Sequence, residues 1–192
     1  MDTFDEWALS LAVFLPLVGM IGVMFAPKRA ELAQKSIALG SAVASLVVGV
    51  IVVTRFDWSD SSTQLGASKQ WIPLINARYD VGVDGIGLPL LLLSMFITVL
   101  VIIYSWDHFP EPHNTKGFLA LMLLLEVGMN GTFVAQDLIL FFIFFEIVLL
   151  PMFFMIGVWG GPNRKYASLK FFLFTLFGSA LMLLGFLALF FL

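Results

Sequence analysis

Three ionisable residues lie inside long apolar stretches of this 192-residue sequence. Glu146 stands in the run FFEIV, Glu126 follows three consecutive leucines, and Lys170 lies near the start of the last apolar stretch. A charged group in the middle of a membrane costs roughly 3 kcal/mol on insertion scales, so such residues usually mark a path for protons or ions. We therefore take Glu146, Glu126 and Lys170 as candidate proton-translocation residues.

The two glutamates are related by the polar pair Gln136 and Asp137, which separates the fourth and fifth apolar stretches. Each glutamate is ten residues from Gln136, which at 1.5 Å per helical residue places both roughly 15 Å from the turn. This spacing predicts that they lie at one level near the bilayer midplane, on neighbouring helices. A carboxyl there can take up and release a proton, which is the chemistry of a relay.

Pro151 lies five residues after Glu146. A proline inside a helix has no N–H to donate, so the carbonyl of Ile147 loses its helical partner. In a membrane a freed carbonyl needs water or a polar side chain. The sequence therefore predicts a helix break near Glu146 that could be hydrated, although proline kinks are also common where no site is present.

Each candidate also has a structural interpretation. Glu146 or Glu126 could serve only as a hydrogen-bonding group between helices, and Lys170 could extend its amine to the membrane surface. Asp137 is most simply the N-cap of the helix that follows it.

Other kinds of site are disfavoured. The group Asp107, His108, Glu111 and His113 has metal-binding side chains, but the prolines between them and their loop setting argue against a metal site. The glycines of residues 81–87 lead into an apolar helix with no phosphate-binding lysine, which argues against a nucleotide loop. The chain has no cysteine, so it cannot hold an iron–sulfur cluster through thiolates.

The composition requires a lipid environment for these residues. Hydrophobic residues make up 60% of the chain, charged residues only 12%, and the mean hydropathy is +1.01, whereas a soluble domain has about 25% charged residues. A net charge of −3 gives no reason to expect nucleic acid as a partner. We expect an all-α polytopic membrane protein with six spanning helices, each about 20 residues long, at residues 7–26, 36–54, 85–106, 117–135, 138–159 and 167–192.

The distribution of basic residues predicts the orientation, since cytoplasmic loops are rich in Lys and Arg. With the N-terminus outside, six basic residues fall in the cytoplasmic loops 27–35, 107–116 and 160–166, against three outside. We expect the long outside segment 55–84 to be an irregular loop with aromatic anchors at the membrane interface. The acidic residues before the first apolar stretch argue against a cleaved signal peptide.

Several of these stretches together resemble a known family. The sequence is similar to the antiporter-like membrane subunits of proton-pumping NADH:quinone oxidoreductase (respiratory complex I), and most of all to the chain M or subunit 4 type. The resemblance spans nearly the whole chain and is carried by residues 79–86 (YDVGVDGI), 137–146 (DLILFFIFFE), 150–152 (LPM), 159–167 (WGGPNRKYA) and 170–179 (KFFLFTLFGS).

The resemblance implies about fourteen helices, so these 192 residues look like an N-terminal fragment. Residues 1–116 would be the three leading helices, and residues 117–192 the first three helices of the first antiporter-like repeat. It also implies that Glu146 pairs with a lysine on a seventh helix that is absent here, and that Lys170 belongs to the polar axis. The support it gives to Glu126 is weaker.

The function implied is proton translocation within the membrane arm, driven by NADH oxidation and quinone reduction elsewhere in the complex. The chain itself would bind no cofactor, because FMN, iron–sulfur clusters and quinone belong to other subunits. Its partners would be other membrane-arm subunits, lipid and protons, in a bacterial plasma membrane. Two alternatives remain at this point: a subunit of a multisubunit cation/proton antiporter, and a structural membrane subunit without transport.

Overall fold

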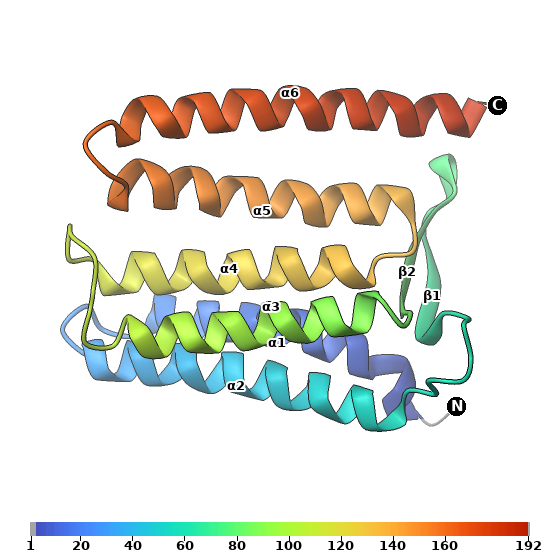
Figure 1. The fold of residues 1–192 in the computed structure, drawn as a ribbon, viewed down its shortest axis with the longest axis horizontal. Helices are drawn as coiled ribbons and strands as arrows, with labels where there is room; N and C mark the ends of the chain where they lie inside the picture. Colours follow the sequence, from blue (N-terminus) through green and yellow to red (C-terminus); the bar gives the residue numbers. More distant parts are fainter. Residues whose placement is uncertain (1–2, 192) are drawn as a thin grey trace.

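The computed structural model describes residues 3–191, which form six long helices and one β-hairpin (Figure 1). All six helices are long and apolar enough to cross a membrane, which confirms the predicted all-α membrane architecture. The helices are α1 (Thr3–Phe25), α2 (Glu31–Arg55), α3 (Gly87–Tyr104), α4 (Thr115–Val134), α5 (Leu138–Trp159) and α6 (Arg164–Phe191).

The helices are arranged around α4. This helix packs against α1, α2, α3 and α5, and most of it is buried, whereas α6 packs on α5 and is almost entirely exposed. Figure 1 shows α4, α5 and α6 as successive layers, with α1, α2 and α3 grouped on the other side of α4. The exposed faces are apolar, as expected of surfaces that contact lipid or further protein.

Polar residues define the start of two helices. The carboxylate of Asp137 accepts hydrogen bonds from the backbone N–H groups of Ile139 at 2.9 Å and Leu140 at 3.0 Å, which confirms its predicted role as N-cap of α5. Asn114 caps α4 in the same way, since its side-chain oxygen accepts from the N–H of Gly117 at 3.1 Å. The two caps stand at opposite ends of the bundle.

A side-chain hydrogen bond links α1 to α2 beside a proline of α1. Pro16 lies inside α1 and cannot donate to the carbonyl of Ala12. The hydroxyl of Ser45, fully buried on α2, donates to this carbonyl at 2.5 Å. A polar side chain of the neighbouring helix thus satisfies the backbone group that the proline leaves free, as the membrane interior requires.

The expectation of an irregular loop at residues 55–84 was wrong. Strands β1 (Gln64–Ile72) and β2 (Ala77–Val83) form an antiparallel hairpin, closed by the 3₁₀ turn η1 (Pro73–Ile75) and by Asn76 in the left-handed conformation (φ 49°). The hairpin escaped prediction because β1 lacks the alternation of apolar and polar residues that marks a half-buried strand.

Tertiary contacts hold the hairpin in place. The backbone N–H of Gln136 donates to the carbonyl of Asp80 at 2.9 Å, and its side-chain amide donates to the carbonyl of Gly82 at 3.1 Å. Asp137, already the cap of α5, also accepts from the N–H of Arg78 at 3.1 Å. The turn between α4 and α5 is therefore anchored to β2 at the end of the bundle where the hairpin lies.

Candidate functional site

The two glutamates lie at equal depth in the bundle. Glu126 is eight residues before the last residue of α4, and Glu146 is eight residues after the first residue of α5. At 1.5 Å per residue, each carboxyl-bearing residue is roughly 12 Å from its end of the helix pair. Their predicted common level is therefore present in the structure.

The two carboxyl groups nevertheless point away from each other. Gly128 of α4 lies directly against Phe144 and Val148 of α5, so these residues define the facing sides of the two helices. Each glutamate is two residues from this contact, Glu126 before Gly128 and Glu146 after Phe144. Two residues turn a helix by roughly 200°, so each carboxyl lies on the far side of its own helix.

Glu126 faces α3 in a buried polar cluster. Its side chain is completely buried, and Asn130, one turn further along α4, is buried on the same face. The hydroxyl of Ser94 on α3 donates to the side-chain oxygen of Asn130 at 2.6 Å, and that of Thr98 donates to the carbonyl of Ser94 at 2.9 Å. These residues escaped sequence analysis because Ser and Thr are frequent in membrane helices, and only the packing of α3 on α4 brings them to Glu126.

The carboxyl of Glu126 interacts with the side chain of Asn130, but neither carboxyl oxygen nor the Asn130 amide nitrogen makes a hydrogen bond of good geometry among the described residues. Buried polar groups are nearly always satisfied, by protein or by ordered water. The α3–α4 cluster therefore has the composition of a site that takes up a proton or an internal water molecule.

Glu146 faces α6, where hydroxyl groups are aligned. The helices are antiparallel, and their register is defined by Gly157 against Ser168 and by the rings of Phe153 and Phe172, whose centroids are 5.1 Å apart. Glu146 precedes Phe153 by seven residues, or nearly two full turns. The residue seven positions after Phe172 is Ser179, so this register places Ser179 opposite Glu146.

Ser179 is one of three hydroxyl-bearing residues on the side of α6 that faces α5, with Ser168 and Thr175. Ser179 is buried, and its hydroxyl donates to the carbonyl of Leu176 at 3.1 Å, so its lone pairs remain available. One carboxyl oxygen of the half-buried Glu146 is itself buried and unpartnered among the described residues. The α5–α6 interface at mid-depth thus combines a carboxyl with hydroxyl groups in an apolar setting.

The structure does not bring Lys170 to either glutamate. It lies two residues after Ser168, which contacts α5, so its side chain points to the opposite face of α6. Lys170 is exposed, with its amine 5.8 Å from the centre of the Tyr166 ring. No ion pair of Lys170 is present in the described part of the chain, and its role in a polar axis stays a prediction.

Pro151 is buried on the side of α5 that faces α4, and the helix continues through it as one element from Leu138 to Trp159. The proline removes the N–H that would bind the Ile147 carbonyl, and a kink there stays a prediction. In the described residues no side chain donates to this carbonyl, in contrast to Ala12, which Ser45 satisfies. A backbone carbonyl deprived of its usual donor thus lies one residue from Glu146.

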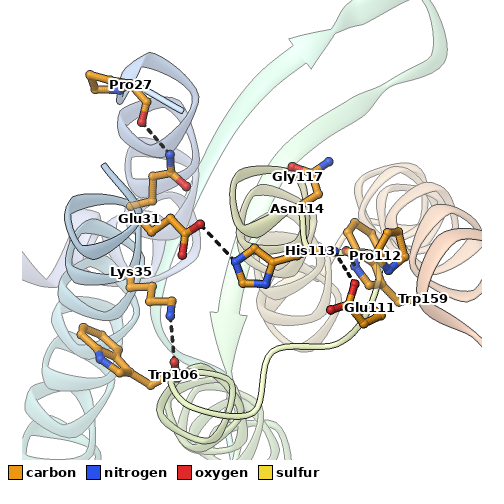
Figure 2. Close-up of polar contacts among 11 residues, drawn as sticks. Pro27, Glu31, Lys35, Trp106, Glu111, Pro112, His113, Asn114, Gly117 and Trp159 are labelled. Carbon is orange, nitrogen blue, oxygen red and sulfur yellow. Dashed lines mark hydrogen bonds and ion pairs between the residues drawn. The ribbon is translucent and has the colours of Figure 1, made fainter. Parts of the chain in front are cut away.

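The residues considered for a metal site do not gather. His113 pairs with Glu31 of α2, with 3.1 Å between Nε2 and Oε1 (Figure 2). His108 instead stacks on the ring of Tyr104. Within residues 3–191 no group of three or more His, Asp or Glu side chains could hold a metal ion.

Six apolar helices, with a carboxyl at mid-depth in each of two neighbouring helices, define a polytopic helical membrane protein. The chain belongs to the NADH-ubiquinone oxidoreductase chain 4 family, whose amino-terminal family model matches residues 11–132. Residues 135–192 match a second model, that of the transmembrane region shared by NADH:quinone oxidoreductase and Mrp antiporters. The resemblance inferred from the sequence motifs is confirmed.

Curated relatives extend this result. The chain is 38% identical over 182 residues to F(420)H(2) dehydrogenase subunit M of Methanosarcina mazei, covering 95% of this chain and 36% of the relative. It is 37% identical to NADH-quinone oxidoreductase subunit M of Rickettsia conorii, covering 92% of this chain and 36% of the relative. The chain thus spans about a third of the length of these relatives.

Solved structures share the fold. A chain of respiratory complex I from Thermus thermophilus with bound NADH is 26% identical and superposes with a TM-score of 0.78, covering 93% of this chain and 35% of that one. A chain of the Mrp complex from Dietzia is 19% identical, with a TM-score of 0.68 over 90% of this chain and 18% of that one. The second likeness is one of fold alone.

Proposed function

We propose that this chain is the leading part of a proton-translocating membrane-arm subunit of NADH:quinone oxidoreductase, in which Glu146 takes up and releases the proton. The observation that carries the proposal is the position of Glu146: mid-depth in a membrane helix, with one carboxyl oxygen buried and unpartnered among the described residues. A charged carboxyl at this depth in a membrane costs free energy, so such a residue usually marks a functional site.

The described surroundings of Glu146 suit proton exchange. The carbonyl of Ile147, which Pro151 deprives of its usual donor, and the hydroxyl of Ser179 are polar groups that could hold water beside the carboxyl. Glu126, with its α3–α4 cluster, is a second proton-holding group at the same depth. Because the two carboxyls point to opposite sides of the α4–α5 pair, they would serve separate steps or separate paths.

The partners and cofactors of the complete complex are part of the proposal. NADH oxidation on FMN and iron–sulfur clusters, and reduction of quinone, would take place in other subunits, and their free energy would reach Glu146 through neighbouring membrane-arm subunits. We place the complex in the bacterial plasma membrane, with loops 27–35, 107–116 and 160–166 on the cytoplasmic side, since these loops carry most of the basic residues. The division of the chain after residue 116 stays a prediction.

A cation/proton antiporter is the second candidate, because the family model of residues 135–192 is common to both kinds of complex. Purification of the complete assembly from its native membrane separates the two. Co-purifying flavin and iron–sulfur proteins would establish the oxidoreductase, whereas an assembly without redox centres that exchanges cations for protons would establish the antiporter.

The role of Glu146 is tested by Glu146→Gln in the complete complex, which keeps the shape of the side chain and removes its proton exchange. We expect assembly and binding of the other subunits to be unchanged, and proton pumping, measured by dye quenching in membrane vesicles, to fall at least tenfold. Glu111→Gln, in the exposed loop after α3, is the matched control and should pump normally. Full pumping by Glu146→Gln would refute the proposed proton exchange and support a purely structural role for this glutamate.

A further inference from the structure

A serine hydroxyl on α3 makes two close contacts within the α3–α4 cluster. The side-chain oxygen of Ser94 lies 2.8 Å from the carbonyl oxygen of Leu91 and 2.6 Å from the side-chain oxygen of Asn130. Both distances are those of hydrogen bonds, but a serine hydroxyl has a single hydrogen to donate. Ser94 can therefore donate to only one of these two groups at a time.

Asn130 can present either end of its amide to this hydroxyl. The amide has an oxygen that accepts and an NH₂ group that donates, and half a turn of the amide exchanges the two within nearly the same space. With the oxygen towards Ser94, the serine hydrogen goes to Asn130, and the contact with Leu91 holds no hydrogen. With the NH₂ group towards Ser94, the amide donates to the serine oxygen and the serine donates to the Leu91 carbonyl, so both close contacts are hydrogen bonds.

The Asn130 amide also meets the carboxyl of Glu126. The two side chains interact, and both residues are 0% exposed. An ionised carboxylate can only accept, so it requires the NH₂ group of the amide, whereas a protonated carboxyl has an O–H that the amide oxygen can accept. The proton on Glu126 therefore decides which way the Asn130 amide turns and, through the amide, which group receives the hydrogen of Ser94.

No other side chain of the described residues competes for this carboxyl. The hydroxyl of Thr98 donates its hydrogen to the backbone carbonyl of Ser94 at 2.9 Å. The charged side chains of α1 and α2 lie near the ends of these helices, α3 has none, and Glu146 points to the far side of α5. The hairpin, with its own charges, lies at the end of the bundle. Asn130 is therefore the group that responds to the charge of Glu126.

We propose that Asn130 and Ser94 are positioning residues that couple the protonation of Glu126 to the hydrogen bonds between α4 and α3. In the protonated state the carboxyl O–H donates to the Asn130 oxygen, the amide donates to Ser94, and Ser94 donates to the Leu91 carbonyl. Release of the proton breaks the O–H bond and passes the proton to water, and the carboxylate then attracts the NH₂ group. Ser94 in turn moves its hydrogen from Leu91 to the Asn130 oxygen.

The protonated state is the one that uses both short contacts of Ser94, so we assign it to the structure. In that state the hydrogen bonds run in one direction from α4 to a backbone carbonyl of α3, and a chain of this kind is strengthened by mutual polarisation. Loss of the proton reverses the bond between Asn130 and Ser94, so α3 senses the charge of Glu126 without touching it. This inference rests on the proposed role of Glu126 as a proton-holding group and is independent of Glu146.

The coupling is tested by infrared difference spectroscopy of the complete complex that contains this subunit. A protonated carboxyl has its own C=O band, whose frequency rises when the acid loses a hydrogen bond, and the band of Glu126 is identified by its disappearance in Glu126→Gln. Asn130→Leu, which keeps the approximate shape of the side chain and removes the amide, should move this band upward. Ser94→Ala should move it in the same direction by less, and should have no effect when residue 130 is already leucine, because Ser94 acts only through Asn130.

Thr132→Val is the matched control, because the Thr132 hydroxyl donates to the Gly128 carbonyl of its own helix at 2.8 Å and lies two residues, or roughly 200°, around α4 from Asn130. It should leave the band in place. The proposal is overturned if Glu126 has no such band, if Asn130→Leu leaves the band unmoved, or if Thr132→Val moves it equally. A further shift by Ser94→Ala in the leucine variant would also overturn it.

The outcome is separable from that of the proposed function. Glu146→Gln should leave the Glu126 band unchanged, because Glu146 does not contact the α3–α4 cluster. If Glu146→Gln pumps fully while Asn130→Leu moves the band, the role proposed for Glu146 fails and the coupling stands. If the band is present but Asn130→Leu does not move it, the coupling fails alone. Ser94→Ala only shortens a side chain, so it gives the same readout if Asn130→Leu does not assemble.

Discussion

Gly128→Ala would test whether the close contact of α4 and α5 determines the position of Glu146. A Cβ atom at residue 128 would lie 2.7 Å from a methyl group of Val148, 3.0 Å from the backbone nitrogen of Val148 and 3.2 Å from the carbonyl oxygen of Phe144. The valine cannot easily turn away, because a β-branched side chain has one preferred rotamer in a helix. The two backbone atoms cannot move without moving α5.

The magnitude follows from these distances. Ordinary carbon contacts begin at about 3.5 Å, so α5 would have to shift by several tenths of an ångström. Overpacking of this kind costs typically about 1–3 kcal/mol, which corresponds to a roughly 5- to 150-fold change in the unfolding equilibrium. The same shift would displace Glu146 relative to α6, so proton pumping should fall with stability.

The assay is reversible unfolding in mixed micelles of increasing denaturing detergent, followed by tryptophan fluorescence. Gly40→Ala on α2 is the matched control, since nothing lies within 4 Å of a Cβ at that position. Its free energy of unfolding should stay the same or rise by up to about 1 kcal/mol through better helix propensity. The reasoning is refuted if Gly128→Ala is as stable as Gly40→Ala.

Three further predictions concern the elements that support the site. Ser45→Ala leaves the Ala12 carbonyl without its donor and should lower the free energy of unfolding by roughly 0.6–1.7 kcal/mol, measured in the same micelles, whereas exposed Ser36→Ala should have no effect. Asp137→Ala should destabilise by about 1–2 kcal/mol through loss of the α5 cap, with Asp137→Asn retaining most of it; equal loss in both would contradict the capping role. Burial raises the pKa of Tyr79, which outweighs the lowering by its hydrogen bond with Ser10. The unfolded chain therefore ionises first above about pH 10, so stability should be complete below that pH and fall above it, a slope that Tyr79→Phe should reduce.

Much of the architecture followed from local sequence. Helices were predictable because a membrane span needs about 20 apolar residues with every backbone group paired internally. The turn at Gln136 and Asp137 was predictable because two polar residues between such runs belong at a surface. The depth of Glu126 and Glu146 then followed from the helical rise alone.

The β-hairpin could not be predicted in the same way. Its first strand is largely exposed and polar, and β2 is held by Gln136 and Asp137, which are more than 50 residues away in sequence. Strand pairing and docking depend on such distant contacts, which no local pattern records.

By itself the sequence determined that the chain lies in lipid, where its six spans are, and how deep each buried charge lies, because hydropathy and helical rise are local properties. Only the tertiary structure decided the direction of each charge. Gly128 lets α4 and α5 approach on one side, which turns Glu126 towards Asn130 and α3 and turns Glu146 towards α6. Lys170 was left on the outer face of α6 for the same physical reason: the face that a helix buries depends on its partner.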